Sequence, residues 1–217
     1  MILFHGNQDK YMIPKYGNGY KNNDYGQGFY TTDDIELAKE WAYTQYIKNG
    51  NGHWVHTYEI DIDKLNVYNL LNDDILYWLA QLYKFRILDS LSEVEKDRLE
   101  KFQSIFYKDL TGYDIIIGWR ADDSYFRYAR DFLSGRIYKS TLEEAIKLGK
   151  LGIQYFIQSK DAIESLKIIK EPLKVDEAYR HKYIKRDKIA KNEYELKLDN
   201  NKYKTEKLTI DMILDRM

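Results

Sequence analysis

Short blocks of apolar residues, separated by polar and glycine-rich segments, predict an interleaved series of strands and helices. Runs with a period of two, or runs that are apolar throughout, are typical of strands, because successive side chains of a strand point to opposite faces. The run within residues 113–118 is short and apolar, which predicts a strand in the interior of a sheet. On this basis we expect strands at residues 2–5, 28–31, 54–62, 113–118, 153–158 and 166–169.

Apolar residues three or four positions apart predict the helices. In the first helix, Asp33 or Asp34 is expected to be the N-cap. Thr141 is expected to open a later helix as half of a capping box with Glu144. The apolar face of the first helix consists of Leu37, Ala38, Trp41 and Ala42. The expected helices are at residues 35–47, 72–88, 92–108, 125–134 and 141–149, with a helical turn at 161–166.

The character of the chain changes after Pro172. Residues 173–217 are dense in Lys, Glu, Asp and Asn, with thinly spaced apolar residues. We therefore predict a domain at residues 1–172 and a charged, helical appendage at 173–217. The appendage is either a solvated tail or a partner-binding arm, because the apolar residues at 208–214 need some cover.

Composition and charge narrow the class of protein. The 217 residues suffice for one large domain, or one domain with an appendage. The formal net charge of −1 gives no overall field that would attract nucleic acid or a membrane. The chain has no Cys, which excludes disulfides and thiolate metal sites. Because there is neither a signal-peptide pattern nor an apolar run of about 20 residues, we predict a soluble cytoplasmic protein with no membrane partner. A toxin exported without a signal peptide would have the same features.

Two phrases near the start of the chain indicate chemistry. In Leu3-Phe4-His5-Gly6 an apolar strand leads into a His, followed by a Gly whose backbone a ligand can approach closely. In Gly26-Gln27-Gly28-Phe29-Tyr30 two glycines flank one residue, and the two aromatic rings then point to opposite faces of a strand. This combination suits a planar carboxamide ring that carries a ribose.

In order and spacing, these phrases resemble the ADP-ribosyltransferase superfamily, in its diphtheria-toxin and poly(ADP-ribose) polymerase branch. In that branch three strands each give one signature residue, in the order His, Tyr, Glu. The phrase at 26–30 resembles the Gly-Lys-Gly-Ile-Tyr of the polymerases, and Gln154-Tyr155-Phe156-Ile157 resembles the third strand. More narrowly, residues 22–32, 38–42, 113–118, 121–123 and 154–156 resemble a bacterial family of uncharacterised ADP-ribosyltransferase-like domains. The resemblance covers about residues 1–170 and implies an α+β fold, a split β-sheet with helices packed around it.

The resemblance implies a role in binding NAD for each matching residue. His5 would bind ribose hydroxyls, Gly6 would offer its backbone N–H and C=O to the carboxamide, and Tyr30 would stack on the nicotinamide. Gly28, with Gly26, would permit the turn that aims Tyr30, and Trp41 would be a second stacking aromatic. Each has a structural alternative: a strand-end His satisfied by backbone, a turn Gly, a core Tyr and a core Trp.

Gln154 departs from the pattern, since the family has a Glu at this position. That Glu hydrogen-bonds the ribose 2′-OH and stabilises the oxocarbenium-like transition state as nicotinamide leaves. A Gln carries no charge and is no general base. Three interpretations stay open: Gln154 suffices alone, a second carboxylate supplies the charge, or the domain binds NAD without turnover. The candidate carboxylates are Asp24, Asp122 and Asp123, of which the latter two could equally cap a helix.

Arginines and histidines elsewhere in the chain bear on phosphate and metal binding. Arg120, Arg127 and Arg130 either hold a pyrophosphate or form a solvated helix face. His53 and His56 lie three positions apart on an expected strand and so point to opposite faces, which argues against a shared metal ion. We therefore predict no metal.

The function that the resemblance implies is an NAD-dependent mono-ADP-ribosyltransferase. NAD is its substrate, and the acceptor is an unknown macromolecule. In a bacterial setting such a protein would be a toxin or conflict effector, neutralised by an antitoxin protein. A different possibility is a module that binds NAD or ADP-ribose without catalysis. A third is a transferase that modifies nucleic acid, which the neutral net charge disfavours despite a basic cluster at Lys182, Lys185, Arg186, Lys188 and Lys191.

Overall fold

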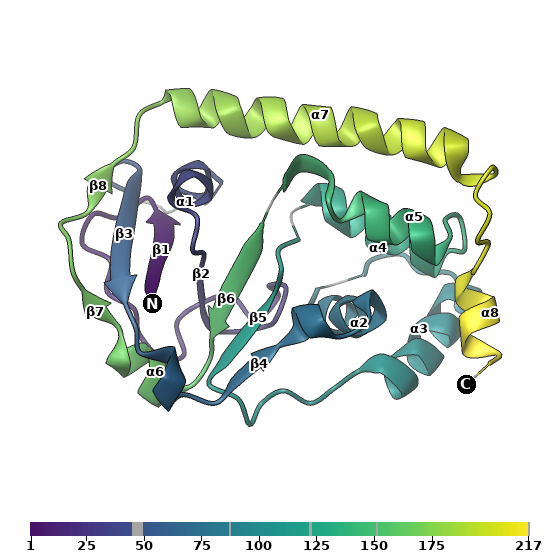
Figure 1. Cartoon of the computed structure of the whole chain (residues 1–217), viewed down its shortest axis with the longest axis horizontal. Coiled ribbons are helices and arrows are strands. Elements are labelled where there is room, and N and C mark those ends of the chain that lie inside the picture. Colours follow the sequence, from purple (N-terminus) through teal and green to yellow (C-terminus); the bar gives the residue numbers. More distant parts are fainter. Residues whose placement is uncertain (45–49, 87, 122, 151, 217) are drawn as a thin grey trace.

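The computed structural model of the chain describes residues 1–44, 50–86, 88–121, 123–150 and 152–216, without the side chains of residues 123–125. It has an α+β architecture built on two sheets, as predicted for the fold class (Figure 1). The first sheet contains β1 (Ile2–Asn7), β3 (Trp54–Glu59), β7 (Lys167–Ile168) and β8 (Leu173–Lys174). The second has the order β2 (Phe29–Thr31), β6 (Ile153–Ile157), β5 (Ile115–Trp119) and β4 (Val67–Asn69).

A single antiparallel bridge joins the two sheets in the described part of the chain. The N–H of Phe4 donates to the carbonyl oxygen of Thr32 at 2.7 Å, and the N–H of Thr32 donates back at 3.0 Å. Beyond this bridge β1 and β2 diverge, because β1 pairs with β3 and β2 pairs with β6. The result is a gap between the sheets at the level of the two sequence phrases.

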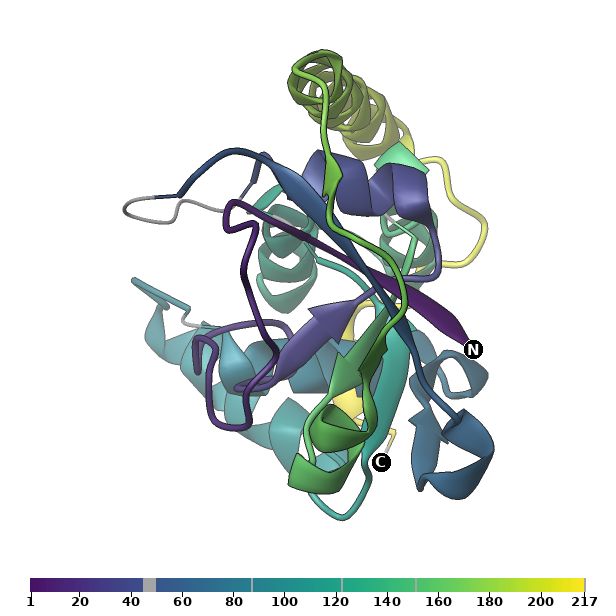
Figure 2. The same cartoon turned by 90° about the vertical axis from the view of Figure 1, so that its left-hand side faces the viewer.

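Helices surround the second sheet and reach across to the first. The α-helices and their bounds are α1 (Ile35–Trp41), α2 (Ile75–Phe85), α3 (Glu93–Phe106), α4 (Asp123–Leu133), α5 (Lys139–Ala145), α6 (Lys160–Ser165), α7 (Ala178–Asn201) and α8 (Ile210–Leu214). Short 3₁₀ turns occur at Ile62–Lys64, Leu70–Asn72 and Leu148–Lys150. Figures 1 and 2 show α7 running along one side of the molecule, with α1 between it and the strands.

The elements follow the predicted pattern closely, and the interior position predicted for the strand at 113–118 is confirmed, since β5 lies between β6 and β4. The strands β4 and β8 were not predicted, because they have three and two residues and no longer apolar run marks them, unlike the equally short β7 within residues 166–169. In α1, Asp34 is the N-cap, and its side chain accepts from the N–H groups of Glu36 and Leu37. The predicted apolar face of α1 is buried. The last predicted positions of this helix, 45–47, lie outside the described residues.

The capping box predicted at Thr141 is wrong. Helix α5 begins earlier, at Lys139, and Tyr138 occupies the N-cap without a side-chain cap. Thr141 is fully buried, and its hydroxyl donates to the side-chain oxygen of Asn201 at 2.6 Å. The Thr141 side chain, which the local sequence pattern predicted as a cap, therefore contacts the end of α7, a segment distant in sequence.

The main core lies between the second sheet and helices α2 to α5. Its largest fully buried side chains include Trp78, Phe102, Phe132 and Phe156. A smaller core between the two sheets is built around Leu3, Phe29, Tyr58 and Ile115. Among the described residues, no helix combines the length and the apolar character needed to cross a membrane.

The described part of the charged segment at residues 173–217 is largely helical, as predicted, although it begins with strand β8 of the first sheet, and it packs against the rest of the chain. Tyr194 of α7 is fully buried, and its hydroxyl donates to a carboxylate oxygen of Asp131 at 2.8 Å. Ile210 and Ile213 of α8 belong to the main core. The cover that the apolar residues at 208–214 require is therefore supplied largely within the chain, and the segment is not a solvated tail.

Candidate active site

A cavity of about 570 Å³ lies at the gap between the two sheets. Its walls come from β1, β2, β6, helix α1, the loop between β1 and β2, and helix α7. Its volume is in the range of sites that hold small molecules and nucleotides. The sequence-predicted residues that line it are His5, Asp24, Gly28, Tyr30, Trp41, Arg120 and Gln154. Residues up to 149 positions apart in the chain are thus brought to one site.

His5 is buried and held at both ring nitrogens. Its Nδ1 lies 2.7 Å from the carbonyl oxygen of Tyr30, and a carbonyl only accepts, so Nδ1 carries the proton. Its Nε2, 3.2 Å from the amide nitrogen of Asn7, is then an acceptor. Burial lowers the pKa of His5 to about 4, against a weaker opposing effect of the Tyr30 hydrogen bond. The imidazole is therefore neutral at pH 7, with one fixed tautomer.

Gly6 lies inside β1 and is required by close packing. A Cβ atom here would be 2.0 Å from the carbonyl oxygen of Ala38 and 2.6 Å from the N–H nitrogen of Ala42, both in the backbone of the α1 region. The interpretation of Gly6 as a simple turn glycine is therefore wrong. Phe4 directs its N–H and C=O toward Thr32, and residues two apart on a strand share this direction. The backbone polar groups of Gly6 thus point away from β3, toward the side where β2 leaves β1. Gly6 itself is not in the cavity wall.

The glycine-rich phrase forms a turn that is tied to Tyr30. Gly26 has φ near +90°, a conformation that favours glycine. The Tyr30 hydroxyl donates to the Gly26 carbonyl at 2.7 Å and accepts from the N–H of Tyr25 at 3.0 Å. Gly28 allows β2 to lie against β6, since a Cβ would be 2.4 Å from the ring of Phe156. The Tyr30 ring contacts the same Phe156 ring, with centroids 4.8 Å apart.

Trp41 and Arg120 contact each other in the cavity wall. The Arg120 guanidinium lies over the Trp41 ring, 4.2 Å from its centroid. Trp41 is only 5% exposed, and its indole N–H has no hydrogen-bond partner among the described residues. A buried donor without a partner is uncommon in proteins, and this one belongs to a residue that lines the cavity.

Gln154 and Asp24 are hydrogen-bonded to each other in the cavity wall. The Gln154 amide nitrogen donates to Asp24 Oδ2 at 3.0 Å and to the Trp119 carbonyl oxygen at 3.2 Å. Asp24 Oδ2 also accepts from the N–H of Ala121 at 2.8 Å, and Asp24 Oδ1 lies 3.4 Å from Nε of Arg86. Burial raises the pKa of Asp24, while Arg86 and the two N–H donors oppose the rise. Of the three carboxylates predicted as acidic helpers, Asp24 is the one that the described structure brings to Gln154.

The charges in the cavity wall are mainly positive. Lys15, Arg86 and Arg120 carry positive charges there, and Asp24 carries the negative one. His5 is neutral at pH 7. Such a balance suits a ligand with a negatively charged group, such as a pyrophosphate.

Other predicted residues are not brought into the cavity. Arg127 pairs with Glu195, and Arg130 donates to the carbonyl oxygen of Asp89 at 3.1 Å, so both belong to the helix surface. Asp122 lies outside the described residues, and so does the side chain of Asp123 in α4.

His53 and His56, which we did not expect to share a metal ion, have separate hydrogen-bond partners. His53 lies 2.8 Å from the Ala42 carbonyl oxygen and His56 lies 3.0 Å from that of Asp9. In the part of the chain that the structure describes, no three His, Asp or Glu side chains are grouped as a metal ion requires. The prediction of no metal stays a prediction.

Sequence reasoning missed several residues of the site. Asn7 carried a signal, since it lies two positions after His5 and therefore on the same strand face. Arg86, at the end of α2, and Tyr183, in α7, also line the cavity. Neither stands near a recognisable phrase, and only the packing of their helices brings them to the site.

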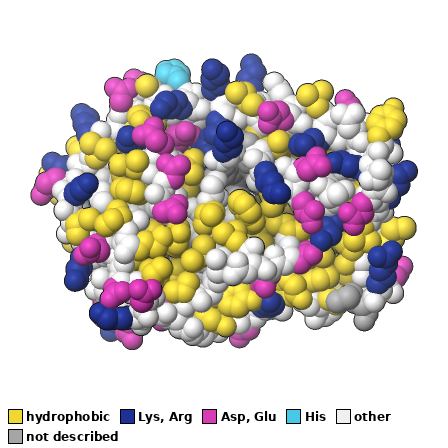
Figure 3. Space-filling view, in the orientation of Figure 1, with side chains coloured by type: hydrophobic (Ala, Val, Ile, Leu, Met, Phe, Trp, Pro, Cys, Tyr) yellow, Lys and Arg dark blue, Asp and Glu magenta, His cyan; other side chains and the backbone are white. Residues whose placement is uncertain are grey.

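The basic cluster at 182–191 is largely neutralised by carboxylates. Lys182 pairs with Glu36, Arg186 with Glu40 and Lys191 with Asp187. Figure 3 shows positive and negative side chains interspersed along the edge where α7 runs. This face therefore does not present the single-sign stripe that is typical of nucleic-acid binding.

Fold and site together define an α+β protein with a nucleotide-sized cavity at the junction of two sheets. The chain belongs to the family described as "Protein of unknown function (DUF3990)", whose model matches residues 1–168. No curated protein and no solved structure matches the chain. Helices α7 and α8 follow the matched segment.

Proposed function

We propose that the protein is an NAD-dependent mono-ADP-ribosyltransferase with a split β-sheet fold of the ADP-ribosyltransferase type. The observation that carries the proposal is the convergence of His5, Tyr30 and Gln154 on one cavity. These residues were predicted from the resemblance of their sequence phrases to a known family, at positions 5, 30 and 154. An unrelated fold has no reason to gather them, with Gly28 and Trp41, around one space.

The environment of each residue suits the role that the resemblance implies. The fixed tautomer of His5 makes Nε2 an acceptor, which the Asn7 amide occupies at 3.2 Å, so a ribose hydroxyl would take the place of Asn7 at this nitrogen. The backbone N–H and C=O of Gly6 point to the side where β2 leaves β1, but Gly6 does not line the cavity, so a carboxamide would have to reach beyond the cavity wall to pair with them. The Tyr30 ring is braced from behind by Phe156 and fixed at its hydroxyl, so it is a rigid surface for stacking.

The positively charged side chains in the cavity wall favour the binding of NAD through its pyrophosphate group. Arg120, which lies over the Trp41 ring, and Arg86 are suitable partners for pyrophosphate oxygens. In the transfer, the bond between ribose C1′ and the nicotinamide nitrogen breaks, and its electron pair leaves with neutral nicotinamide. An acceptor nucleophile then bonds to C1′ and loses its proton to solvent. The protein holds the ribose and the nicotinamide so that this bond is exposed to the acceptor.

A second candidate function is an NAD-binding or ADP-ribose-binding module without turnover. The observation that favours it is the uncharged side chain of Gln154, where the related enzymes have Glu. The two functions make the same demands on binding and differ only in the release of nicotinamide.

The test is the release of nicotinamide from NAD by the purified protein, with NAD binding measured by calorimetry in parallel. We expect release that rises when cell lysate is added as a source of acceptor, and that falls at least about tenfold in His5→Ala. His181→Ala is the matched control, because His181 is an exposed residue of α7 that does not line the cavity. Binding without release would favour the binding module, and the absence of both would contradict both functions.

The same assay tests the chemical class of the acceptor. We propose a macromolecular acceptor, with a toxin or conflict-effector role and an antitoxin protein as a partner. Treating the lysate with protease or with nuclease before the assay separates a protein acceptor from a nucleic acid. We expect protease to abolish the stimulation, since the basic cluster of α7 is already paired with carboxylates.

A further inference from the structure

The orientation of the Gln154 amide is fixed by its neighbours. Both contacts of its nitrogen, Asp24 Oδ2 and the Trp119 carbonyl oxygen, are groups that accept. Turning the amide over would set its own oxygen against these two oxygens, which is strongly unfavourable. The amide therefore uses both N–H groups in the wall, and its carbonyl oxygen is left for a ligand in the cavity.

The surroundings of Asp24 suit its ionised form. Its contacts are all with donors: the N–H of Ala121, the amide of Gln154 and, at 3.4 Å, the Arg86 guanidinium. A protonated carboxyl would need an acceptor for its proton, and none of these groups is one. Asp24 is only 6% exposed, so its charge acts through an interior of low dielectric constant.

We propose that Asp24 and Gln154 together replace the single acidic residue of the related enzymes. Asp24 is the positioning residue, which holds the Gln154 amide with its oxygen toward the substrate and supplies the negative charge that the amide lacks. Gln154 accepts from the ribose hydroxyl, and the charge of Asp24, polarising the amide from behind, stabilises the positive charge that develops at C1′ as nicotinamide leaves. This inference rests on the proposed transferase function.

Asp24 has two proposed effects, namely its negative charge and the orientation that it gives to the Gln154 amide. Two variants of Asp24 separate these effects. In Asp24→Asn, one oxygen can still accept from Ala121 and Gln154, so the amide of Gln154 stays in place while the charge is lost. In Asp24→Ala, both are lost. Adding Gln154→Glu to Asp24→Asn returns one carboxylate to the site, on β6 instead of the loop.

The experiment measures kcat and KM for nicotinamide release in the full-length protein. We expect Asp24→Asn to lower kcat about 100-fold, with KM for NAD within about threefold of the wild type. The double variant should recover at least about tenfold of kcat over Asp24→Asn. Asp109→Asn is the matched control, because the Asp109 side chain also accepts from a backbone N–H, that of Thr111, but lies outside the cavity wall. Its kcat should stay within about twofold of the wild type.

The outcomes distinguish this inference from the proposed function. An active wild type with an equally active Asp24→Asn, or a folded double variant no better than Asp24→Asn, overturns the inference alone. A wild type that releases no nicotinamide overturns the transferase function, and with it the catalytic half of the inference.

The positioning half is tested without any reaction. The side-chain amide protons of Gln154, followed by NMR, should exchange slowly with solvent in the wild type and in Asp24→Asn, and fast in Asp24→Ala. Fast exchange in the wild type would contradict the positioning.

Discussion

At the scale of single residues, His5 makes the stability of the fold depend on pH. Its pKa is about 4 in the folded protein, lowered by burial from an ordinary value of 6.5. The unfolded chain therefore binds a proton as the pH falls below 6.5, and the folded chain does so only near pH 4. Stability conferred by the neutral imidazole is thus present above pH 6.5 and is lost toward pH 4.

We expect the wild type to lose about 2 kcal/mol of unfolding free energy through His5 between pH 7 and pH 5. The measurement is urea denaturation at both pH values for the wild type and for His5→Gln, which has no group that titrates in this range. The difference between the two proteins should shrink by that amount at pH 5. An equal difference at both pH values would mean that folding does not shift the pKa of His5.

The hydroxyl group and the ring of Tyr30 have different contacts. The hydroxyl bonds to the backbone, and the residue lines the cavity. Tyr30→Phe removes the group that pairs with the Tyr25 N–H and the Gly26 carbonyl. We expect a loss of about 1–3 kcal/mol of unfolding free energy, because two buried backbone groups lose a partner. If the ring stacks on nicotinamide, the Kd for NAD should change less in Tyr30→Phe than in Tyr30→Leu. Tyr11→Phe, at a residue that is 74% exposed, is the control and should be neutral in both assays.

At the scale of elements, the contact between β1 and α1 depends on Gly6. Gly6→Ala would drive a methyl group into the backbone of α1, which cannot move away as a flexible side chain could. We expect a loss of at least about 3 kcal/mol, at or beyond the upper end of ordinary overpacking. Gly112→Ala is the matched control, because a Cβ there meets nothing within 4 Å. A Gly6→Ala protein as stable as Gly112→Ala would contradict the close packing.

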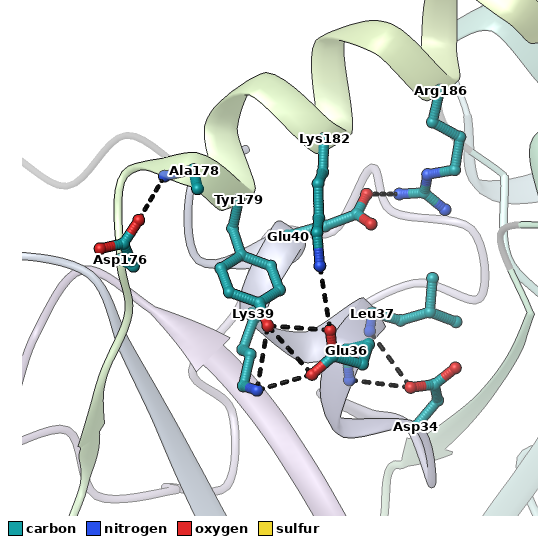
Figure 4. A network of polar contacts seen from close by, with 10 residues as sticks. All are labelled: Asp34, Glu36, Leu37, Lys39, Glu40, Asp176, Ala178, Tyr179, Lys182 and Arg186. Carbon is teal, nitrogen blue, oxygen red and sulfur yellow. Dashed lines mark hydrogen bonds and ion pairs between the residues drawn. The ribbon is translucent and has the colours of Figure 1, made fainter.

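A network of ion pairs fastens α7 to α1. Figure 4 shows Lys182 and Arg186 of α7 reaching Glu36 and Glu40 of α1. The Arg186–Glu40 pair is largely buried, with 16% and 11% of the side chains exposed, whereas the Lys182–Glu36 pair is half exposed. The two pairs therefore differ in what their loss should cost.

We expect Arg186→Met to lower the unfolding free energy by about 3 kcal/mol, since it leaves a buried carboxylate without its partner. Lys182→Met, which breaks the exposed pair of the same network, should cost less than about 1 kcal/mol. Thermal and urea unfolding of both variants provide the comparison. Equal, small losses would mean that water reaches Glu40.

At the scale of the whole molecule, the segment that follows the family match is part of the fold. The match ends at residue 168, yet Tyr194, Ile210 and Ile213 are buried beyond it. We expect a chain that ends at Asp176 to lack cooperative urea unfolding, because each missing large apolar side chain removes about 1.5–3 kcal/mol of burial. Circular dichroism during the titration provides the measurement, with the full chain as the reference.

Local sequence patterns predicted most of the helices and strands. The side-chain contacts between them depend on residues that are distant in sequence and were not predictable. The apolar run at 113–118 and the cap at Asp34 depend on neighbours in sequence, so both were predictable. The contact between Asp24 and Gln154 spans 130 positions and leaves no periodic trace. The same holds for Thr141, which bonds to Asn201 where the local pattern indicated a cap. Six lining residues were predictable because their phrases resemble a known family, namely His5, Asp24, Gly28, Tyr30, Trp41 and Gln154, and a seventh, Arg120, was a candidate through its charge. Arg86 and Tyr183, which line the same cavity, were not predictable.

The cavity uses residues that lie far apart in the chain, and this has a consequence for timing. His5 and Tyr183 both line the cavity and are 178 positions apart. A ribosome adds about 5–20 residues per second, so roughly 9–36 s separate the synthesis of the two. The lining of the cavity is therefore incomplete in a nascent chain until the segment that contains Tyr183 has been added and has packed.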